Sequence, residues 1–311
     1  MHRGCALAQN WDDLRIFLGV ARGQSLSAAG KTLRIDPATV GRRIARLEQR
    51  MGTPLFAKSP LGYELSAAGT RLLPLAEQAE QAMGAAGDLM VQGAASGSEI
   101  SGTIRIGAPD GCANFLLPQV CARIVEAHPD LDVQIVALPR VVNLSKREAD
   151  MAITVSAPTA GRLMVQKLSD YKLHLAASPK YLRAAGPLLT KEDLQVHRMI
   201  GYIPDMIFDK ELDYLSALGV QRVPLASNSV AVQFHAIRQG AGLGIVHDFA
   251  LPAAPELTRL LVDKVSLTRS FYLVRHGSDR RLQRLNRFAE ALAAGIRAEI
   301  VHLESVAILN E

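Results

Sequence analysis

The hydrophobic positions of the first 65 residues recur at helical spacing and are interrupted by short polar turns. The first set predicts a helix and consists of Leu14, Phe17, Leu18 and Ala21. A turn at Gly23-Gln24 follows this helix. Ser25 or Ser27 is then placed to cap a second helix that runs to Leu33, because a serine hydroxyl accepts hydrogen bonds from the free N–H groups of a first turn.

The third helix carries two distinct faces. Asp36 stands where an N-cap belongs, Pro37 occupies the first helical position, and Gly52 ends the helix after Met51. An apolar stripe predicts the buried face and comprises Val40, Ile44, Leu47 and Met51. A basic face lies elsewhere on the helix and comprises Arg42, Arg46 and Arg50, with Thr39 and Arg43 beside them. A helix of this kind, placed after a helix and a tight turn, is typical of a helix-turn-helix.

A hairpin and a long helix are predicted next. Short extended segments around Pro60-Leu61-Gly62 predict a wing, which completes a winged helix-turn-helix domain over residues 1–65. Residues 66–92 predict one helix with a heptad seam of Leu72, Ala76, Ala79, Met83, Ala86 and Met90. We favour a dimerisation helix; the alternative is an amphipathic helix lying on its own domain. Pro74 should bend this helix or mark a late start.

A linker at 93–101 separates this part from residues 102–311, where strands and helices alternate. Strands are predicted at 103–108, 132–138, 151–155, 173–177, 199–202, 244–247 and 270–275. Helices are predicted at 115–127, 179–184, 230–239 and 281–298. This alternation predicts an α/β domain with a mostly parallel sheet and helices on both faces, long enough to form two lobes.

Charge and composition add a candidate partner. The 311 residues carry a formal net charge of +5, and the segment from Lys31 to Lys58 accounts for all of it, with seven basic and two acidic side chains. A local basic patch suits a polyanion, although a solvated helix face is the alternative. Three cysteines have no metal-ligand spacing, and there is neither a signal peptide nor a run of about 20 apolar residues. We therefore expect a cytoplasmic protein without a metal or cofactor and without a membrane span.

Several motifs resemble those of LysR-type transcriptional regulators. The N-terminal ones are Trp11–Phe17, Leu26–Leu33, Thr39–Glu48, Gly52–Phe56 and Leu65–Gly69, and those of the body are Arg147–Ile153 and Gly240–Ile245. The resemblance implies a winged helix-turn-helix, a dimerising linker helix and a two-lobed effector-binding domain similar to periplasmic binding proteins. It also implies homodimers that pair into tetramers on interrupted palindromic operators in double-stranded DNA. A small molecule bound between the lobes would shift the DNA-binding heads, and RNA polymerase is a further candidate partner.

Two residues depart from the family pattern in the third helix. Pro37 offers no side-chain hydrogen bond, and Gly41 stands where the family often has serine. Base reading is therefore assigned to Thr39, Arg42 and Arg43, since arginine can grip guanine O6 and N7 and a threonine methyl can meet a thymine methyl. Phosphate contacts, which position the protein without specifying a sequence, are assigned to Arg46, Arg50, Lys58, Ser25 and Ser27.

Ligands of open α/β sheets lie beyond the carboxyl ends of strands. The effector-site candidates at these ends are Asp110, Cys112, Arg140, Thr154, Tyr202 and His247. Asn228 and Ser229 are further candidates, because they lie ahead of a predicted helix whose N-terminus could bind an anion. Arg140 suits a carboxylate or is an ordinary surface arginine, and His247 is either a ligand contact or a structural histidine. Asp110 is unusual for an anion site: it could cap the following helix or bind a cationic or hydroxylated ligand. Cys112 is either inert or a helix-terminal thiol with a lowered pKa.

Enzyme function is disfavoured because the sequence lacks the motifs of phosphate loops, metalloproteases and nucleophile elbows. The glycines of Gly240–Gly244 precede a predicted strand and suit close packing at a turn. We predict a sequence-specific DNA-binding transcriptional regulator controlled by a small-molecule effector. One rival is a solute-binding protein whose N-terminal helices serve only for dimerisation; another is an α/β enzyme with a helical appendage.

Overall fold

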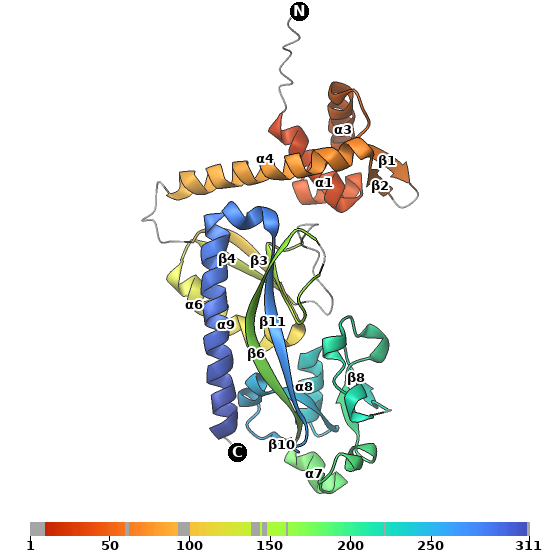
Figure 1. Cartoon of the computed structure of the whole chain (residues 1–311), viewed down its shortest axis with the longest axis vertical. Helices are drawn as coiled ribbons and strands as arrows, with labels where there is room; N and C mark the ends of the chain where they lie inside the picture. Colours follow the sequence, from red (N-terminus) through yellow and green to blue (C-terminus); the bar gives the residue numbers. More distant parts are fainter. Residues whose placement is uncertain are drawn as a thin grey trace, which may run out of the picture. The chain divides into compact units, whose positions relative to one another are not determined.

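The structure is a computed structural model that describes residues 10–59, 62–92, 100–137, 144, 148–159, 161–220 and 222–309. The chain divides into two compact units, which are described separately (Figure 1). The N-terminal unit covers described residues 10–92 together with 278–283, and the C-terminal unit covers the described residues of 100–277 and 284–309. The predicted linker 93–101 lies largely outside the described residues.

Side chains cap the three helices that open the N-terminal unit. These helices are α1 (Trp11–Gly23), α2 (Leu26–Leu33) and α3 (Pro37–Met51). The Ser25 hydroxyl accepts a bond from Ala28 N, so Ser25 and not Ser27 is the N-cap of α2. The Asp36 carboxylate accepts bonds from the first free N–H groups of α3, and Gly52 ends α3 with a φ of 66°. Each helix boundary is therefore explained by a residue within a few positions of it.

The predicted apolar stripes form one core in this unit. Leu14, Phe17 and Leu18 of α1 pack with Val40 and Ile44 of α3, and all five are buried. At the end of α2, a Cβ on Gly30 would lie 2.6 Å from Ile35 O, so the turn into α3 requires glycine there. The helix-turn-helix predicted from sequence is confirmed.

A two-stranded hairpin follows, made of β1 (Phe56–Ser59) and β2 (Gly62–Leu65) in antiparallel register. Glu48 of α3 fixes the start of this hairpin, because Glu48 Oε1 accepts hydrogen bonds from Leu55 N at 2.7 Å and from Phe56 N at 3.1 Å. The predicted wing is confirmed, and a carboxylate ties it to α3.

The predicted heptad seam lies on the long helix α4 (Ala67–Gln92), and its first half is buried whereas residues of its second half are exposed. Leu72 and Ala76 are buried in the core of the same unit, and Ala79 packs against it. The prediction of a dimer seam is wrong for this half, where the helix lies on its own domain. Met83 is 51% exposed, and Ala86 is exposed too. The helix runs through Pro74 from Ala67, so a late start is also wrong.

The C-terminal unit is built on one large sheet. Among the described residues it contains nine strands, in the order β4-β3-β5-β11-β6-β9-β7-β8 with β10 on β6. The strands are β3 (Gly102–Ala108), β4 (Leu131–Ala137), β5 (Met151–Thr154), β6 (Leu163–Ala177), β7 (Met199–Gly201), β8 (Leu225–Ala226), β9 (Leu243–His247), β10 (Thr258–Leu260) and β11 (Ser266–His276).

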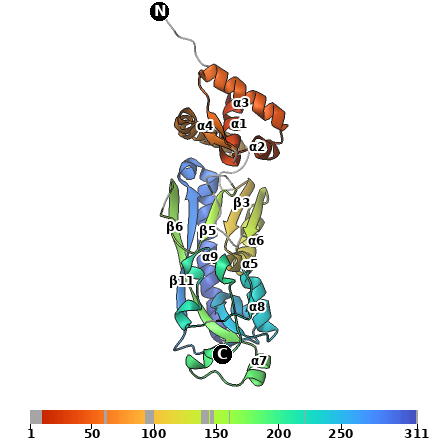
Figure 2. The ribbon, with the colours of Figure 1, turned by 90° about the vertical axis from the view of Figure 1, so that its right-hand side faces the viewer.

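The sheet is parallel only at its two ends. Strand β3 pairs in parallel with β4 and β5, and β7 pairs in parallel with β8 and β9. Between these groups, β6 and β11 run antiparallel to each other and to their neighbours. The prediction of a mostly parallel sheet is therefore wrong for the centre, where the two long strands lie side by side along the unit (Figure 1, Figure 2).

Helices complete two lobes around the end groups. Lobe I comprises β3, β4 and β5 with α5 (Asp110–Phe115) and α6 (Leu117–Ala127). Lobe II comprises β7 to β10 with α7 (Pro179–Ala185), α8 (Val230–Arg238) and short 3-10 turns: η2 (Glu192–Gln195), η3 (Pro204–Met206), η4 (Lys210–Leu212), η5 (Ser216–Leu218) and η6 (Asp248–Ala253). The turn η7 (Gly277–Arg281) precedes the closing helix α9 (Gln283–Leu309), which extends well beyond the predicted end at Ala298.

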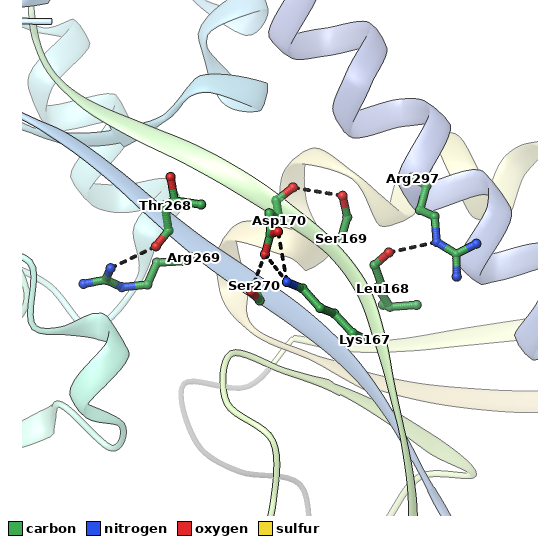
Figure 3. Close-up of polar contacts among 8 residues, drawn as sticks. All are labelled: Lys167, Leu168, Ser169, Asp170, Thr268, Arg269, Ser270 and Arg297. Atoms are coloured by element: carbon green, nitrogen blue, oxygen red, sulfur yellow. Dashed lines mark hydrogen bonds and ion pairs between the residues drawn. The ribbon is translucent and has the colours of Figure 1, made fainter. Parts of the chain in front are cut away.

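The two crossing strands carry a bulge where they pass between the lobes. Phe271 pairs with Ser169 and Tyr272 pairs with Lys167, which leaves Leu168 as the extra residue. Its carbonyl accepts a 2.8 Å bond from Arg297 Nε of α9. Figure 3 shows this contact beside the Lys167–Asp170 ion pair and the bond from Ser270 to Asp170. Side chains thus satisfy the bulge that bends the connection between the lobes.

Candidate DNA-binding face and effector site

The basic face predicted on α3 is accessible. Arg42, Arg46 and Arg50 are exposed, and Thr39 and Arg43 are half-buried. Arg42 Nη2 donates a 2.9 Å hydrogen bond to Thr39 Oγ1, which orients the guanidinium over the first turns of the helix. The structure therefore places Thr39 and Arg42 together on the exposed part of α3, with Arg43 nearer the buried stripe and the acids of α1.

Asp13 of α1 contacts two of these arginines and was not predicted as part of the face. It is only 4% exposed, and its carboxylate pairs with the Arg50 guanidinium. Arg43 Nη1 lies 3.8 Å from a carboxylate oxygen of Asp13 and of Asp12. In the sequence these acids look like ordinary first-turn residues of α1. Asp13 thus joins α1 to α3 and already pairs with Arg50, to which a phosphate contact was assigned.

The remaining predicted DNA contacts lie outside α3. Ser25 is half-buried and already accepts from Ala28 N, whereas Ser27 in the first turn of α2 is exposed. Lys58 of β1 is exposed, with its ammonium group 5.9 Å from the centre of the Tyr63 ring. Ser27 and Lys58 are thus accessible to the phosphate backbone of DNA, whereas the Ser25 hydroxyl already has a partner within α2.

In the C-terminal unit, several predicted effector residues meet at the junction of the two lobes. Asp110 of lobe I reaches the start of α8 in lobe II, where its Oδ2 accepts from Ser229 Oγ and from Ala231 N, each at 2.9 Å. A Cβ on Gly111 would lie 3.2 Å from His247 Cε1, so α5 packs closely against the end of β9. We call this region the lobe junction.

A second hydrogen bond joins the two lobes, and here the carboxylate comes from lobe II. The Ser156 hydroxyl of lobe I hydrogen-bonds the carboxylate of Asp209, which precedes η4 in lobe II. The predicted residue Thr154 supports Ser156, because its hydroxyl donates a 2.7 Å hydrogen bond to Ser156 O. Neither Ser156 nor Asp209 was predicted, because only the three-dimensional fold brings the two segments together.

Aromatic rings surround His247 at the junction. Tyr171 stacks on His247 with ring centres 5.4 Å apart, and Tyr214 meets it edge-on at 6.4 Å. Tyr202 in turn packs edge-on against Tyr214 at 6.0 Å. Tyr171 was missed because β6 was predicted to begin only at Leu173, and Tyr214 because its segment has no clear periodicity.

Comparison with known proteins identifies the family. Residues 11–70 match the family described as "Bacterial regulatory helix-turn-helix protein, lysR family", and residues 97–297 match the LysR substrate binding domain. The chain belongs to the LysR family. It is a DNA-binding transcriptional regulator with an effector-binding domain, which confirms the main prediction and contradicts the rival of a solute-binding protein with purely dimerising helices.

Relatives of this LysR-family chain span almost its full length. It is 27% identical over 293 residues to the glycine cleavage system transcriptional activator of Escherichia coli, covering 92% of this chain and 93% of that protein. It is 26% identical over 262 residues to the regulator PtxR of Pseudomonas aeruginosa, covering 81% and 82%. The solved structure of CrgA, a LysR-type regulator of Neisseria meningitidis, shares the fold with a TM-score of 0.58 and 22% identity, covering 93% of this chain and 99% of that one. These relatives are regulators, in agreement with the prediction that the chain is not an enzyme.

A cavity of about 250 Å³ opens in lobe II of this regulator, between the sheet and the segment from 203 to 220. It is lined by Ile200, Gly201, Tyr202, Pro204, Ile207, Leu212, Asp213, Tyr214, Leu215, Ser216, Val220, Val223, Gln233 and Ile245. Tyr202 and Tyr214 belong both to this lining and to the aromatic cluster of the junction. The cavity was not predicted, because most of its wall is a segment without regular periodicity.

Burial keeps the junction side chains neutral. Burial lowers the pKa of His247 to about 4, and burial raises the pKa values of Tyr171, Tyr202 and Tyr214. Burial also raises the pKa of the Cys112 thiol, which favours the inert interpretation over a reactive thiolate. The junction therefore offers neutral hydrogen-bonding groups beside the Asp110 carboxylate.

Not every predicted effector residue takes part in the junction contacts. Asn228 is half-buried just before the N-cap of α8, and Arg140 lies outside the described residues. Across the described part of the chain, no group of three or more His, Cys, Asp or Glu side chains is arranged to hold a metal. Within the same residues, no helix has the length and apolar character needed to cross a bilayer.

Proposed function

We propose that this LysR-family chain reads operator DNA with α3 and responds to a small molecule at the lobe junction. Base edges would be read by Thr39, Arg42 and Arg43, and phosphates would be contacted by Arg46, Arg50, Lys58, Ser25 and Ser27. The observation that carries the proposal is the accessible basic face of α3, on a helix that is held in place by a separate buried face. An α-helix presented in this way fits the major groove of double-stranded DNA.

The arginines of α3 differ in what holds them before DNA binds. Among the described residues, Thr39 is the one side chain that orients Arg42, so the Arg42 guanidinium is available to a guanine edge. Arg43 lies at ion-pair distance from two acids, whereas Arg50 contacts the buried Asp13 directly. We therefore assign the larger share of base reading to Arg42 and Arg43, with Arg50 shared between DNA and the α1–α3 contact.

The proposed assembly is a homodimer through the exposed face of α4, with dimers pairing into tetramers. Leu75 in the first half of α4 is 60% exposed and Met83 in the second half is 51% exposed in the single chain, and a second copy would cover both. The site of action is the cytoplasm, with RNA polymerase as the partner through which bound protein changes transcription. No metal or other cofactor is required by this proposal.

The proposed effector site is the lobe junction with the adjoining cavity. Asp110, Ser229, Tyr202 and His247 approach one another there from both lobes. A small molecule that contacts both lobes binds more tightly to the arrangement in which the lobes are close together. It would therefore shift the population of the protein toward that arrangement. We propose four secondary candidates for contact with the effector: Cys112, Thr154, Asn228 and Arg140.

The test uses genomic DNA fragments selected by the wild-type protein. Affinities of wild type, Arg42→Ala and Arg43→Ala are measured by fluorescence anisotropy, with Arg183→Ala on the exposed surface of α7 as a control of equal charge change. Loss of an arginine contact to a base costs about 1–3 kcal/mol, which is a loss of affinity of roughly 5- to 150-fold.

The expected result is a loss in that range for each α3 variant, together with a relaxed sequence preference. Arg183→Ala should bind like wild type. Affinity and preference that survive both α3 substitutions would contradict the assignment of α3 as the reading helix.

A further inference from the structure

The N-terminus of α8 at the lobe junction already holds a carboxylate. Ser229 is the N-cap of this nine-residue helix, and its hydroxyl donates to Asp110 Oδ2 at 2.9 Å. The backbone N–H of Ala231 donates to the same oxygen at 2.9 Å. Asn114 Nδ2 holds the other oxygen, Oδ1, at 3.2 Å. Helix N-termini with free N–H groups are where proteins bind the carboxylates and phosphates of ligands, and here a residue of the opposite lobe fills that place.

Other contacts hold the two lobes together around this bond. The Phe115 ring of α5 packs edge-on against Phe234 of α8, with ring centres 5.0 Å apart. The Ser156–Asp209 hydrogen bond joins the lobes with the roles reversed, since the serine comes from lobe I and the carboxylate from lobe II. The junction is thus closed by the chain's own carboxylates, in the way that an acidic ligand would close it.

The adjoining cavity is also unsuited to an anion. Among its described lining residues there is no Lys, Arg or His, and Asp213 contributes a carboxylate. Arg269 lies over the Tyr214 ring at 6.0 Å, but its charge is paired with Glu211 at 3.0 Å. An anion placed there would lose its hydration without gaining a free cation, which is costly in a buried site.

The cavity nevertheless has an unused polar partner. Tyr214 is 5% exposed and lines the cavity. Its hydroxyl lies close to the Tyr171 side chain but makes no hydrogen bond of normal length among the described residues. A buried hydroxyl without a partner carries a free-energy penalty that a ligand or a water molecule would remove. The rest of the wall is mainly apolar. At about 250 Å³ the space lies near the lower end of the volumes of small-molecule sites.

We propose that Asp110 is a tethered carboxylate that fills the anion position of the effector site, so that the effector of this regulator is a small uncharged molecule. The effector places an apolar body in the cavity and a hydrogen-bonding group at the Tyr214 hydroxyl. Asp110 is thereby a specificity-determining residue, because it excludes carboxylates and phosphates from α8. This inference rests on the proposed function only in taking the lobe junction as the effector site.

The experiment measures which charge class the full-length protein binds. Matched pairs of small carboxylic acids and their primary amides are screened by ligand-observed NMR against wild type, Asp110→Ala and Asp132→Ala. Asp132 is an exposed carboxylate on β4 and serves as the control of equal charge change. In parallel, thermal unfolding is followed by circular dichroism with sodium acetate, acetamide or sodium chloride at matched concentration.

Wild type and Asp132→Ala should bind amides and not the matching acids. Asp110→Ala should gain at least about tenfold in affinity for the acids, since the emptied helix terminus regains a charged partner. Acetate, but not acetamide or chloride, should raise the unfolding midpoint of Asp110→Ala while leaving wild type unmoved. If Asp110→Ala does not fold, Asp110→Asn keeps an acceptor for α8, should fold, and should still fail to bind acids.

Acids that bind wild type as tightly as amides, or acetate that acts equally on all variants, would overturn the inference. The same preparations are tested for binding to the selected DNA. A wild-type protein that fails to bind DNA selectively would overturn the proposed function while leaving the acid and amide comparison intact.

Discussion

The contact between Glu48 and the wing gives a prediction whose size follows from the structure. Glu48 Oε1 accepts hydrogen bonds from two backbone N–H groups, at 2.7 Å from Leu55 N and 3.1 Å from Phe56 N. Leu55 is 0% exposed and Phe56 is 8% exposed, so water has little access to these donors. Each buried donor left without a partner costs about 1–3 kcal/mol. Because two donors are involved, Glu48→Ala should lower the free energy of unfolding of the N-terminal unit by roughly 2–6 kcal/mol.

Glu48→Gln is the matched control. Its amide oxygen can still accept from the same two donors and loses only the assistance of the charge, so about 1 kcal/mol or less should be lost. Helix propensity favours alanine slightly over both side chains, and the loss expected for Glu48→Ala therefore reflects the missing acceptor.

The chain provides its own probe for this measurement. Its single tryptophan is Trp11, which packs against the core of the N-terminal unit. Urea unfolding of the full-length protein followed by tryptophan fluorescence reports on this unit alone. Equal losses for Glu48→Ala and Glu48→Gln, or a loss below about 0.5 kcal/mol for Glu48→Ala, would refute the reasoning.

Two further predictions concern stability. The pKa of His247 is lowered by burial from 6.5 to about 4, so the unfolded chain binds the proton more readily and stability is lost as the pH falls from 6.5 towards 4. Between pH 7 and pH 5 the C-terminal unit of wild type should lose about 2 kcal/mol more than His247→Gln in urea unfolding followed by circular dichroism, and equal losses would contradict this. Gly41→Ala should stabilise the N-terminal unit by up to about 1 kcal/mol, because the new methyl meets only the flexible Leu26 side chain, at 3.2 Å. Gly30→Ala should destabilise it, because its methyl would lie 2.6 Å from the Ile35 carbonyl, and the reverse order by tryptophan fluorescence would refute this packing.

Local chemistry made the N-terminal unit predictable. The caps at Ser25, Asp36 and Gly52 lie within a few residues of the helix ends that they set, so a single sequence contains the whole signal. The same holds for the apolar stripe of α3, which gives the buried face and hence the exposed basic one.

Features that depend on distant segments were not predictable in this way. The first half of β6 has an irregular pattern of exposure, and only its pairing with β11 makes it a strand. The helix predicted at 115–127 is in fact two consecutive helices, of which the first starts at Asp110 and the second at Leu117. Pro118 lies in the first turn of the second helix, where the missing N–H is tolerated. The heptad seam of α4 could not show that Leu72 and Ala76 face their own domain.

The candidate effector site illustrates both situations. The ends of predicted strands pointed to Asp110, Tyr202 and His247, and the structure places these residues close together at the lobe junction. Ser229, predicted from its place before a helix, meets Asp110 there. The occupation of the α8 N-terminus by Asp110 joins residues 119 positions apart, and no local pattern encodes it.

Genome-wide footprinting of the purified protein, repeated across a series of salt concentrations, tests whether the chain reads DNA through α3. We expect a small set of protected sites that share an interrupted palindrome and are lost on double substitution of Arg42 and Arg43 by alanine. We also expect affinity to fall with salt by roughly 0.9 log units per neutralised phosphate for each log unit of salt. Protection without a shared sequence, or a set of sites unchanged by the double substitution, would contradict reading through α3.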